Sequence, residues 1–78
     1  MMPMQLRISR TTANSSCLLS FGYAPSVQVL EVEFPGGRVY RYFDVSSGIY
    51  QGLVEAPSKG RYFHRFIRKL SFAEYKPS

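Results

Sequence analysis

In the middle of the chain, apolar and polar residues alternate with the period of a β-strand. In residues 27–34, Leu30, Val32 and Phe34 have one parity and Glu31 and Glu33 have the other, which predicts a strand with one buried face. An apolar run covers residues 17–23, and a run rich in β-branched and aromatic residues covers residues 38–45. Short breaks separate the three runs, so we predict a three-stranded antiparallel β-meander.

The turn at residues 35–37 decides where Tyr40 and Tyr42 point. A two-residue turn of Gly36 and Gly37 places both tyrosines on the face of the glutamates, whereas a three-residue turn places them on the face of the apolar residues. Both glycines accept positive φ, so the sequence favours the two-residue turn and leaves the other register open.

After residue 45 the apolar period changes from that of a strand to that of a helix. Ser46 or Ser47 is a suitable N-cap, and Pro57 ends the first helix, whose apolar positions are Ile49, Tyr50, Leu53 and Val54. Ser58 caps a second helix, whose apolar stripe is Tyr62, Phe63, Phe66, Ile67 and Leu70. The predicted fold class is therefore α+β, with the two short helices packed on one face of the meander.

The length of 78 residues allows one core, which we assign to a single domain over residues 14–76. Residues 1–13 are expected to form a flexible N-terminal segment. The alternation of Met4, Leu6 and Ile8 leaves an additional edge strand as the alternative.

Composition indicates a folded, basic protein. Apolar residues make up 45% of the chain, and ten Lys and Arg against five Asp and Glu give a net charge of +5, which favours anionic partners. The single cysteine indicates a reducing compartment, and no run is apolar enough for a signal peptide or a membrane span. We expect a cytoplasmic monomer that does not bind membranes.

The sequence offers few side chains that could support catalysis. Cys17 and His64 are the only residues of their types, and we predict Cys17 in an apolar strand and His64 in a basic helix, which disfavours an activated thiolate. One His, one Cys and one Asp cannot complete a tetrahedral metal site. We therefore predict a protein that is not an enzyme and has no metal or cofactor.

The second helix carries the strongest functional signal. Five cations fall between residues 59 and 69 with no acid among them: Lys59, Arg61, Arg65, Arg68 and Lys69. The spacing of Arg61, Arg65 and Arg68 places them on one helical face, where like charges repel. This face either binds an anion or is simply solvated, and a solvated face is the commoner cause.

The segment from Ser58 to Arg61 is a candidate anion site. Cations in the first turn of a helix oppose the helix dipole, and a bound phosphate would remove this conflict. Gly60 would let the anion approach closely. The alternative is a capped helix start in which Gly60 serves backbone packing.

Tyr40 and Tyr42 share the parity of Arg38, and such a surface can stack nucleic-acid bases. The competing interpretation is that both rings fill the core, because Phe and Tyr must supply much of it in a chain without Trp.

Several segments together resemble the KTSC domain, which is named for the C-terminal extension of some lysyl-tRNA synthetases. They are SSCLLSFGY, LEVEF, the central YRY and APSKGRYFHRFI, within residues 15–75. Two positions depart from the family pattern: Ala24 replaces an acid after Gly-Tyr, and Ser46 replaces a proline. The resemblance implies a stand-alone KTSC protein, and the family's association with a synthetase suggests RNA binding.

Charge and resemblance together predict a non-enzymatic binding module for an anionic partner, with RNA favoured. The predicted binding residues are Lys59, Gly60, Arg61, Arg65, Arg68, Lys69, Arg38, Arg41, Tyr40 and Tyr42. The alternative is a protein–protein interaction module that docks on an acidic or apolar patch of its partner.

Overall fold

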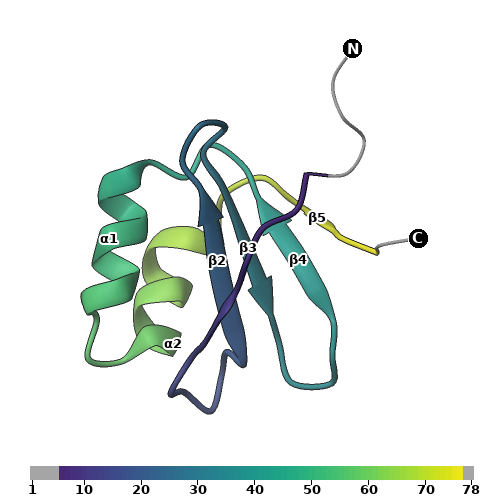
Figure 1. Ribbon diagram of the computed structural model, residues 1–78. Helices are drawn as coiled ribbons and strands as arrows, with labels where there is room; N and C mark the ends of the chain where they lie inside the picture. The colour runs from purple at the N-terminus through teal and green to yellow at the C-terminus, as the bar shows by residue number, and fades with distance from the viewer. Residues whose placement is uncertain (1–5, 77–78) are drawn as a thin grey trace.

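The structure, a computed structural model, describes residues 6–76, which form a five-stranded antiparallel sheet with two helices against one face (Figure 1). The elements in chain order are β1 (Thr11–Thr12), β2 (Ser20–Ala24), β3 (Val29–Glu33), β4 (Val39–Tyr42), α1 (Ser47–Glu55), α2 (Lys59–Tyr62), the π-helical turn η1 (Phe63–Ile67) and β5 (Phe72–Glu74). The strands lie side by side in the order β1-β2-β3-β4-β5. The helix α2 continues directly into η1, so the two form one helix.

The predicted α+β class and the central meander β2-β3-β4 are confirmed, but the predicted number of strands is wrong. The described residues add β1 and β5 at the two edges of the sheet. These strands have two and three residues, which is too short for an alternating pattern to be recognised in the sequence.

The β3-β4 hairpin has the three-residue turn, so the favoured two-residue register is wrong. The amide of Phe34 donates to the Arg38 carbonyl at 2.8 Å, and the Gly37 amide donates back to the Phe34 carbonyl at 3.0 Å. Gly36 and Gly37 have φ of 99° and 87°. Proline at the second position followed by a glycine with positive φ is the pattern of a type II turn, and Pro35 therefore sets the longer loop.

This register places Tyr40 opposite Val32 and Tyr42 opposite Leu30. Directly opposed side chains point to the same face of a sheet, so both tyrosines face the helices. Tyr42 is only 5% exposed. Core filling is thus the correct interpretation for Tyr42, and its ring cannot serve as a platform for bases.

The two helices close the core over β2 and β3. The Ser46 hydroxyl accepts from the Ile49 amide at the start of α1, and the buried residues of both helices meet the inner face of the sheet. The core consists of Ala13, Leu18, Phe21, Leu30, Val32, Tyr42, Val45, Leu53, Phe63 and Ile67. Phe63 and Ile67 are buried as the helical pattern predicts, whereas Phe66 is 38% exposed.

The N-terminal residues cross the sheet on the face opposite the helices. A Cβ placed on Gly22 would lie 2.0 Å from the Ser9 carbonyl oxygen, so the two backbones are in direct contact and only glycine fits there. Thr11 and Thr12 then pair with β2. The edge strand in this segment is therefore Thr11–Thr12, whereas Leu6 and Ile8 of the alternating pattern are not in a strand and Met4 lies outside the described residues.

Beneath this crossing segment lies an ion pair network around Glu31, which is 2% exposed. Its carboxylate accepts from Arg41 Nε at 2.7 Å and from the guanidinium of Arg10. The Arg41 guanidinium also donates to the Leu6 carbonyl and lies 3.7 Å from the centre of the Tyr75 ring. The Arg41 guanidinium is therefore held by partners within the chain, which argues against its predicted role as an anion ligand.

Candidate anion-binding groove

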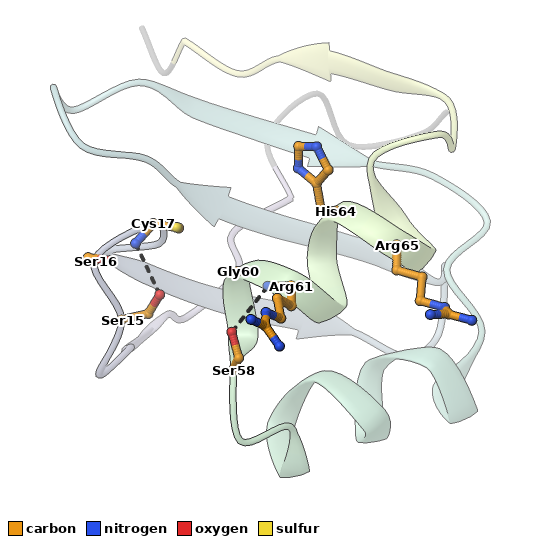
Figure 2. Close-up of a pocket in the computed structure, with 8 residues that line it drawn as sticks. All are labelled: Ser15, Ser16, Cys17, Ser58, Gly60, Arg61, His64 and Arg65. Atoms are coloured by element: carbon orange, nitrogen blue, oxygen red, sulfur yellow. Dashed lines mark hydrogen bonds between the residues drawn. The ribbon is translucent and has the colours of Figure 1, made fainter.

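An open groove of about 640 Å³ lies between the start of the second helix and the loop before β2 (Figure 2). It is lined by Ser15, Ser16, Cys17, Ser58, Gly60, Arg61, His64 and Arg65. None of these lining residues is acidic, and two are arginines. Hydroxyl groups and cations are the side chains that bind phosphate oxygens in proteins.

The capped start of the second helix positions Arg61. The Ser58 hydroxyl accepts from the Arg61 amide at 3.4 Å, so this amide already has a partner inside the chain. The Arg61 amide is therefore not free to bind an anion. Its side chain remains exposed and points into the groove region in Figure 2.

The π-helical turn changes how the cations are grouped. Arg61 and Arg65 line the groove, and both also line an adjoining hollow of about 310 Å³ beside Pro57. Arg68 lies instead within 3.0 Å of the His64 ring nitrogen Nε2. A π turn is wider than an α turn, so the face predicted for three arginines holds two of them.

Lys59 has a role that the sequence did not indicate. Its ammonium donates to the carbonyl oxygens of Val54 and Ala56, both at 3.1 Å, and these carbonyls end α1. The favourable interaction of the Lys59 cation with the C-terminal end of α1 offsets its unfavourable interaction with the N-terminal end of the second helix. The conflict that suggested a phosphate is thus relieved by the chain itself, which removes that argument for Lys59 as an anion ligand.

Gly60 packs against the loop before β2. A Cβ at Gly60 would lie 2.8 Å from Cys17 Sγ and 3.0 Å from Cys17 Cβ, so a side chain there would displace the cysteine. The packing alternative for Gly60 is therefore present in the structure. It brings the loop and the helix together and thereby forms one wall of the groove.

The sequence placed Cys17 in a strand, but β2 begins only at Ser20 and Cys17 is exposed in the preceding loop. The Cys17 amide donates to the Ser15 hydroxyl at 3.1 Å, which holds the loop in a tight bend. This loop brings Ser15, Ser16 and Cys17 to the groove wall opposite Arg61 (Figure 2). Their signal in the sequence was a run of small polar residues directly before an apolar strand.

The remaining predicted residues lie outside the groove. Arg38 is exposed beside the β3-β4 turn, and Lys69 is exposed just after η1. The half-buried Tyr40 contacts the rings of Phe34 and Phe72, both with centroids 5.8 Å away. The predicted set is therefore divided between the helix, the hairpin end and the sheet face.

Two tyrosines have altered acidity. Burial raises the pKa of Tyr42 above its ordinary value of 10.0, the neighbouring Tyr40 raises it further, and the Arg68 cation opposes both effects. Burial also raises the pKa of Tyr23, whose hydroxyl donates to the Val45 carbonyl. Both groups remain neutral at physiological pH, so neither contributes charge to the groove.

Within residues 6–76, no group of three or more His, Cys, Asp and Glu side chains is close enough to hold a metal ion. In the same part of the chain, no helix has the length and apolarity needed to span a membrane.

The model of the KTSC domain family matches residues 14–72 of the chain. The chain belongs to the KTSC family. An uncharacterized protein of Stutzerimonas stutzeri is 44% identical over 69 residues, which cover 88% of this chain and 97% of that protein. The crystal structure of a KTSC domain protein from Yersinia pestis has a TM-score of 0.83 and 33% identity, and the match covers 90% of this chain and all of that one.

A second kind of relative carries a KTSC region inside a much longer chain. The lysine–tRNA ligase of Nostoc sp. is 43% identical over 53 residues, which cover 68% of this KTSC protein but only 9% of the ligase. The ligase of Nostoc punctiforme is 42% identical over 60 residues, or 11% of its length. The similarity therefore concerns a small part of each enzyme.

Proposed function

We propose that this KTSC protein is a non-enzymatic module that binds RNA in the cytoplasm through the exposed cations of its second helix. The observation that carries the proposal is the groove lined by Arg61 and Arg65 without an acidic residue among its lining side chains. The relatives named lysine–tRNA ligases support RNA as the polyanion, because such a ligase acts on tRNA.

Arg61 and Arg65 of this helix are available for a partner. In residues 6–76, the ion pairs join Arg10 and Arg41 to Glu31 and Glu33, and none involves the second helix. The chain has no acid between Glu55 and Glu74. The guanidinium groups of Arg61 and Arg65 therefore have no internal carboxylate partner among the described residues.

The arrangement fits a chain of phosphates better than a single ion. Residues four positions apart on a helix differ by about 6 Å along its axis. Figure 2 shows that Arg61, His64 and Arg65 point in different directions from the helix. One small anion would contact only part of this set, whereas an extended strand can place successive phosphates beside Arg61 and Arg65.

Charge reversal at the groove tests the proposal. In the double variant Arg61→Glu/Arg65→Glu, we expect nucleic-acid affinity to be lost while the circular dichroism melt stays unchanged, because both side chains are exposed. Neutralising the same two residues in Arg61→Gln/Arg65→Gln should lower the slope of log affinity against log salt by about 1.4 for single-stranded RNA.

The matched control is Arg7→Glu/Lys76→Glu, which changes the net charge equally at two exposed residues away from the groove. We expect this control to retain most of the affinity. Equal losses in the two charge-reversal variants would mean that only net charge matters and would contradict a site at the groove. An affinity for an acidic protein that exceeds that for RNA would favour the protein-interaction alternative instead.

A further inference from the structure

The two helices leave the β5 edge of the helix-facing side of the sheet uncovered, and aromatic rings lie there. Figure 1 shows α1 and α2 beside β2, whereas β5 lies beyond β4 at the other edge. Phe72 of β5 pairs with Tyr42, so its side chain points to the helix-facing side of the sheet. With no helix above it, Phe72 is 55% exposed and is the most exposed large apolar residue described.

The ring of Phe72 meets two tyrosine rings, one edge-to-face and one tilted. The Tyr40 ring lies 5.8 Å from that of Phe72 at an interplanar angle of 69°, and the Tyr42 ring lies 5.4 Å away at 39°. Phe34 meets Tyr40 at 68°. Neither neighbour of Phe72 is parallel to it, so no described ring stacks on the face of Phe72. A planar partner can therefore stack there.

Cations border this aromatic surface on the side of the second helix. Arg68 contacts His64, which lines the groove, and the core residue Phe63 precedes His64 in the chain. Phe63 in turn touches the rings of Phe34 and Tyr42. The second helix, which carries these cations, thus packs on Tyr42, whose ring lies beside that of Phe72.

We propose that Phe72, with Tyr40 beside it, stacks an unpaired base of a single-stranded RNA whose phosphates follow the cations of the second helix. This inference rests on the proposed function and adds the class of nucleic acid that is bound. A π-face accepts any base, so the surface selects single strands rather than sequences. In a duplex the bases already stack on one another and leave no face for Phe72.

The position of the acidic residue Glu74 agrees with that orientation. Glu74 pairs with Tyr40 and therefore points to the same face, at the edge away from the helices. Phosphates are repelled from this edge and attracted to the helix side. The uncharged bases would then lie toward β5 and the backbone toward Arg68.

The first test uses Phe72→Leu, which removes the ring but no charge. A mixed-sequence RNA of about 12 nucleotides and a duplex of the same length are the two probes. We expect single-strand affinity to fall by at least about 5-fold, the lower end for base–aromatic stacking, with an unchanged salt slope and unchanged duplex affinity. The exposed Phe43 provides the matched control, since Phe43→Leu removes an aromatic ring that belongs to none of these ring pairs and should leave both affinities unchanged.

The second test uses Phe72→Trp, because the chain contains no other tryptophan. Single-stranded RNA should quench the fluorescence of this indole with the same midpoint as the binding curve, and the duplex should not. The proposal would be overturned if bound single-stranded RNA left the indole fluorescence unchanged. It would also be overturned if Phe72→Leu lost equal affinity for the single strand and the duplex. Self-association that disappears in Phe72→Leu would overturn it as well, because the ring would then serve a second copy.

The two proposals fail in distinguishable ways. If Arg61→Glu/Arg65→Glu has no effect on either probe, the proposed function is wrong. If that variant loses both probes while Phe72→Leu loses neither, RNA binding stands and the stacking surface is refuted.

Discussion

The ion pair network around Glu31 makes a strong prediction about stability. The side chain of Glu31 is 3% exposed and that of Arg41 is 12% exposed. Two unit charges about 4 Å apart attract by about 4 kcal/mol at an effective dielectric constant of 20. In Glu31→Gln the size and one acceptor are kept, but the charge that balances two guanidinium groups is lost.

Breaking a buried pair in this way costs about 3–5 kcal/mol, because the remaining charge stays desolvated. We take the lower end, about 3 kcal/mol, because glutamine still accepts a hydrogen bond from Arg41. A domain of this size has a free energy of unfolding of about 4–12 kcal/mol. The variant should thus lose a large part of its stability, and its melting temperature should fall by roughly 12–24 °C.

Glu33→Gln is the matched control on the same strand. Glu33 lies 3.9 Å from Arg10 and its side chain is 28% exposed. This partly solvated pair should contribute about 1 kcal/mol or less. Urea unfolding of both variants gives the comparison, and equal costs at Glu31 and Glu33 would refute the network as described. In Glu31→Met/Arg41→Met, stability should recover relative to Glu31→Gln, since neither charge is then buried.

Two further predictions concern a glycine and a tyrosine. Gly52→Ala should destabilise the protein although alanine favours helix formation, because a Cβ there would lie 2.1 Å from the Tyr62 hydroxyl. Gly48→Ala on the same helix is the control. A Cβ at Gly48 has no contact closer than 3.9 Å, so this variant should be neutral or stabilising by up to about 1 kcal/mol. In urea unfolding, we expect the two variants to change the free energy of unfolding in opposite directions. A stabilising Gly52→Ala would contradict the close packing of Gly52 against Tyr62. Because burial raises the pKa of Tyr42, stability is retained below pH 10 and falls as pH rises above it, where the unfolded chain ionises first. Tyr42→Phe should flatten this fall, and an identical alkaline profile in the variant would show that Tyr42 does not cause it.

The helices and the central strands could be predicted because each carries a strong local signal. The serine caps, the proline after α1 and the buried Phe63 and Ile67 all follow from patterns within one element. The hairpin register could not be predicted from the glycines alone, because Pro35 determines the loop through the turn type that it favours. One residue of register then moved Tyr40 and Tyr42 from the acidic face to the core face.

The groove depended on contacts between segments distant in the sequence, which no local pattern reports. Gly60 meets Cys17, and this contact brings the loop of Ser15 and Ser16 to the helix. Likewise, the partners of Lys59 and Arg41 are on other elements. The sequence therefore identified the basic helix but could not separate the cations that stabilise the fold from those that face solvent.

That separation also explains how a domain with modest net charge can present a strongly basic surface. Arg10 and Arg41 are neutralised by Glu31 and Glu33 on the face opposite the helices, so these four residues contribute no net charge. Residues 59–69 contain five cations and no acid, which equals the net charge of +5 of the whole chain. The positive potential is thus concentrated on one helix rather than spread over the surface. A polyanion is attracted to the same helix whose groove holds Arg61 and Arg65, so reversing those two residues should reduce the rate of association as well as the affinity.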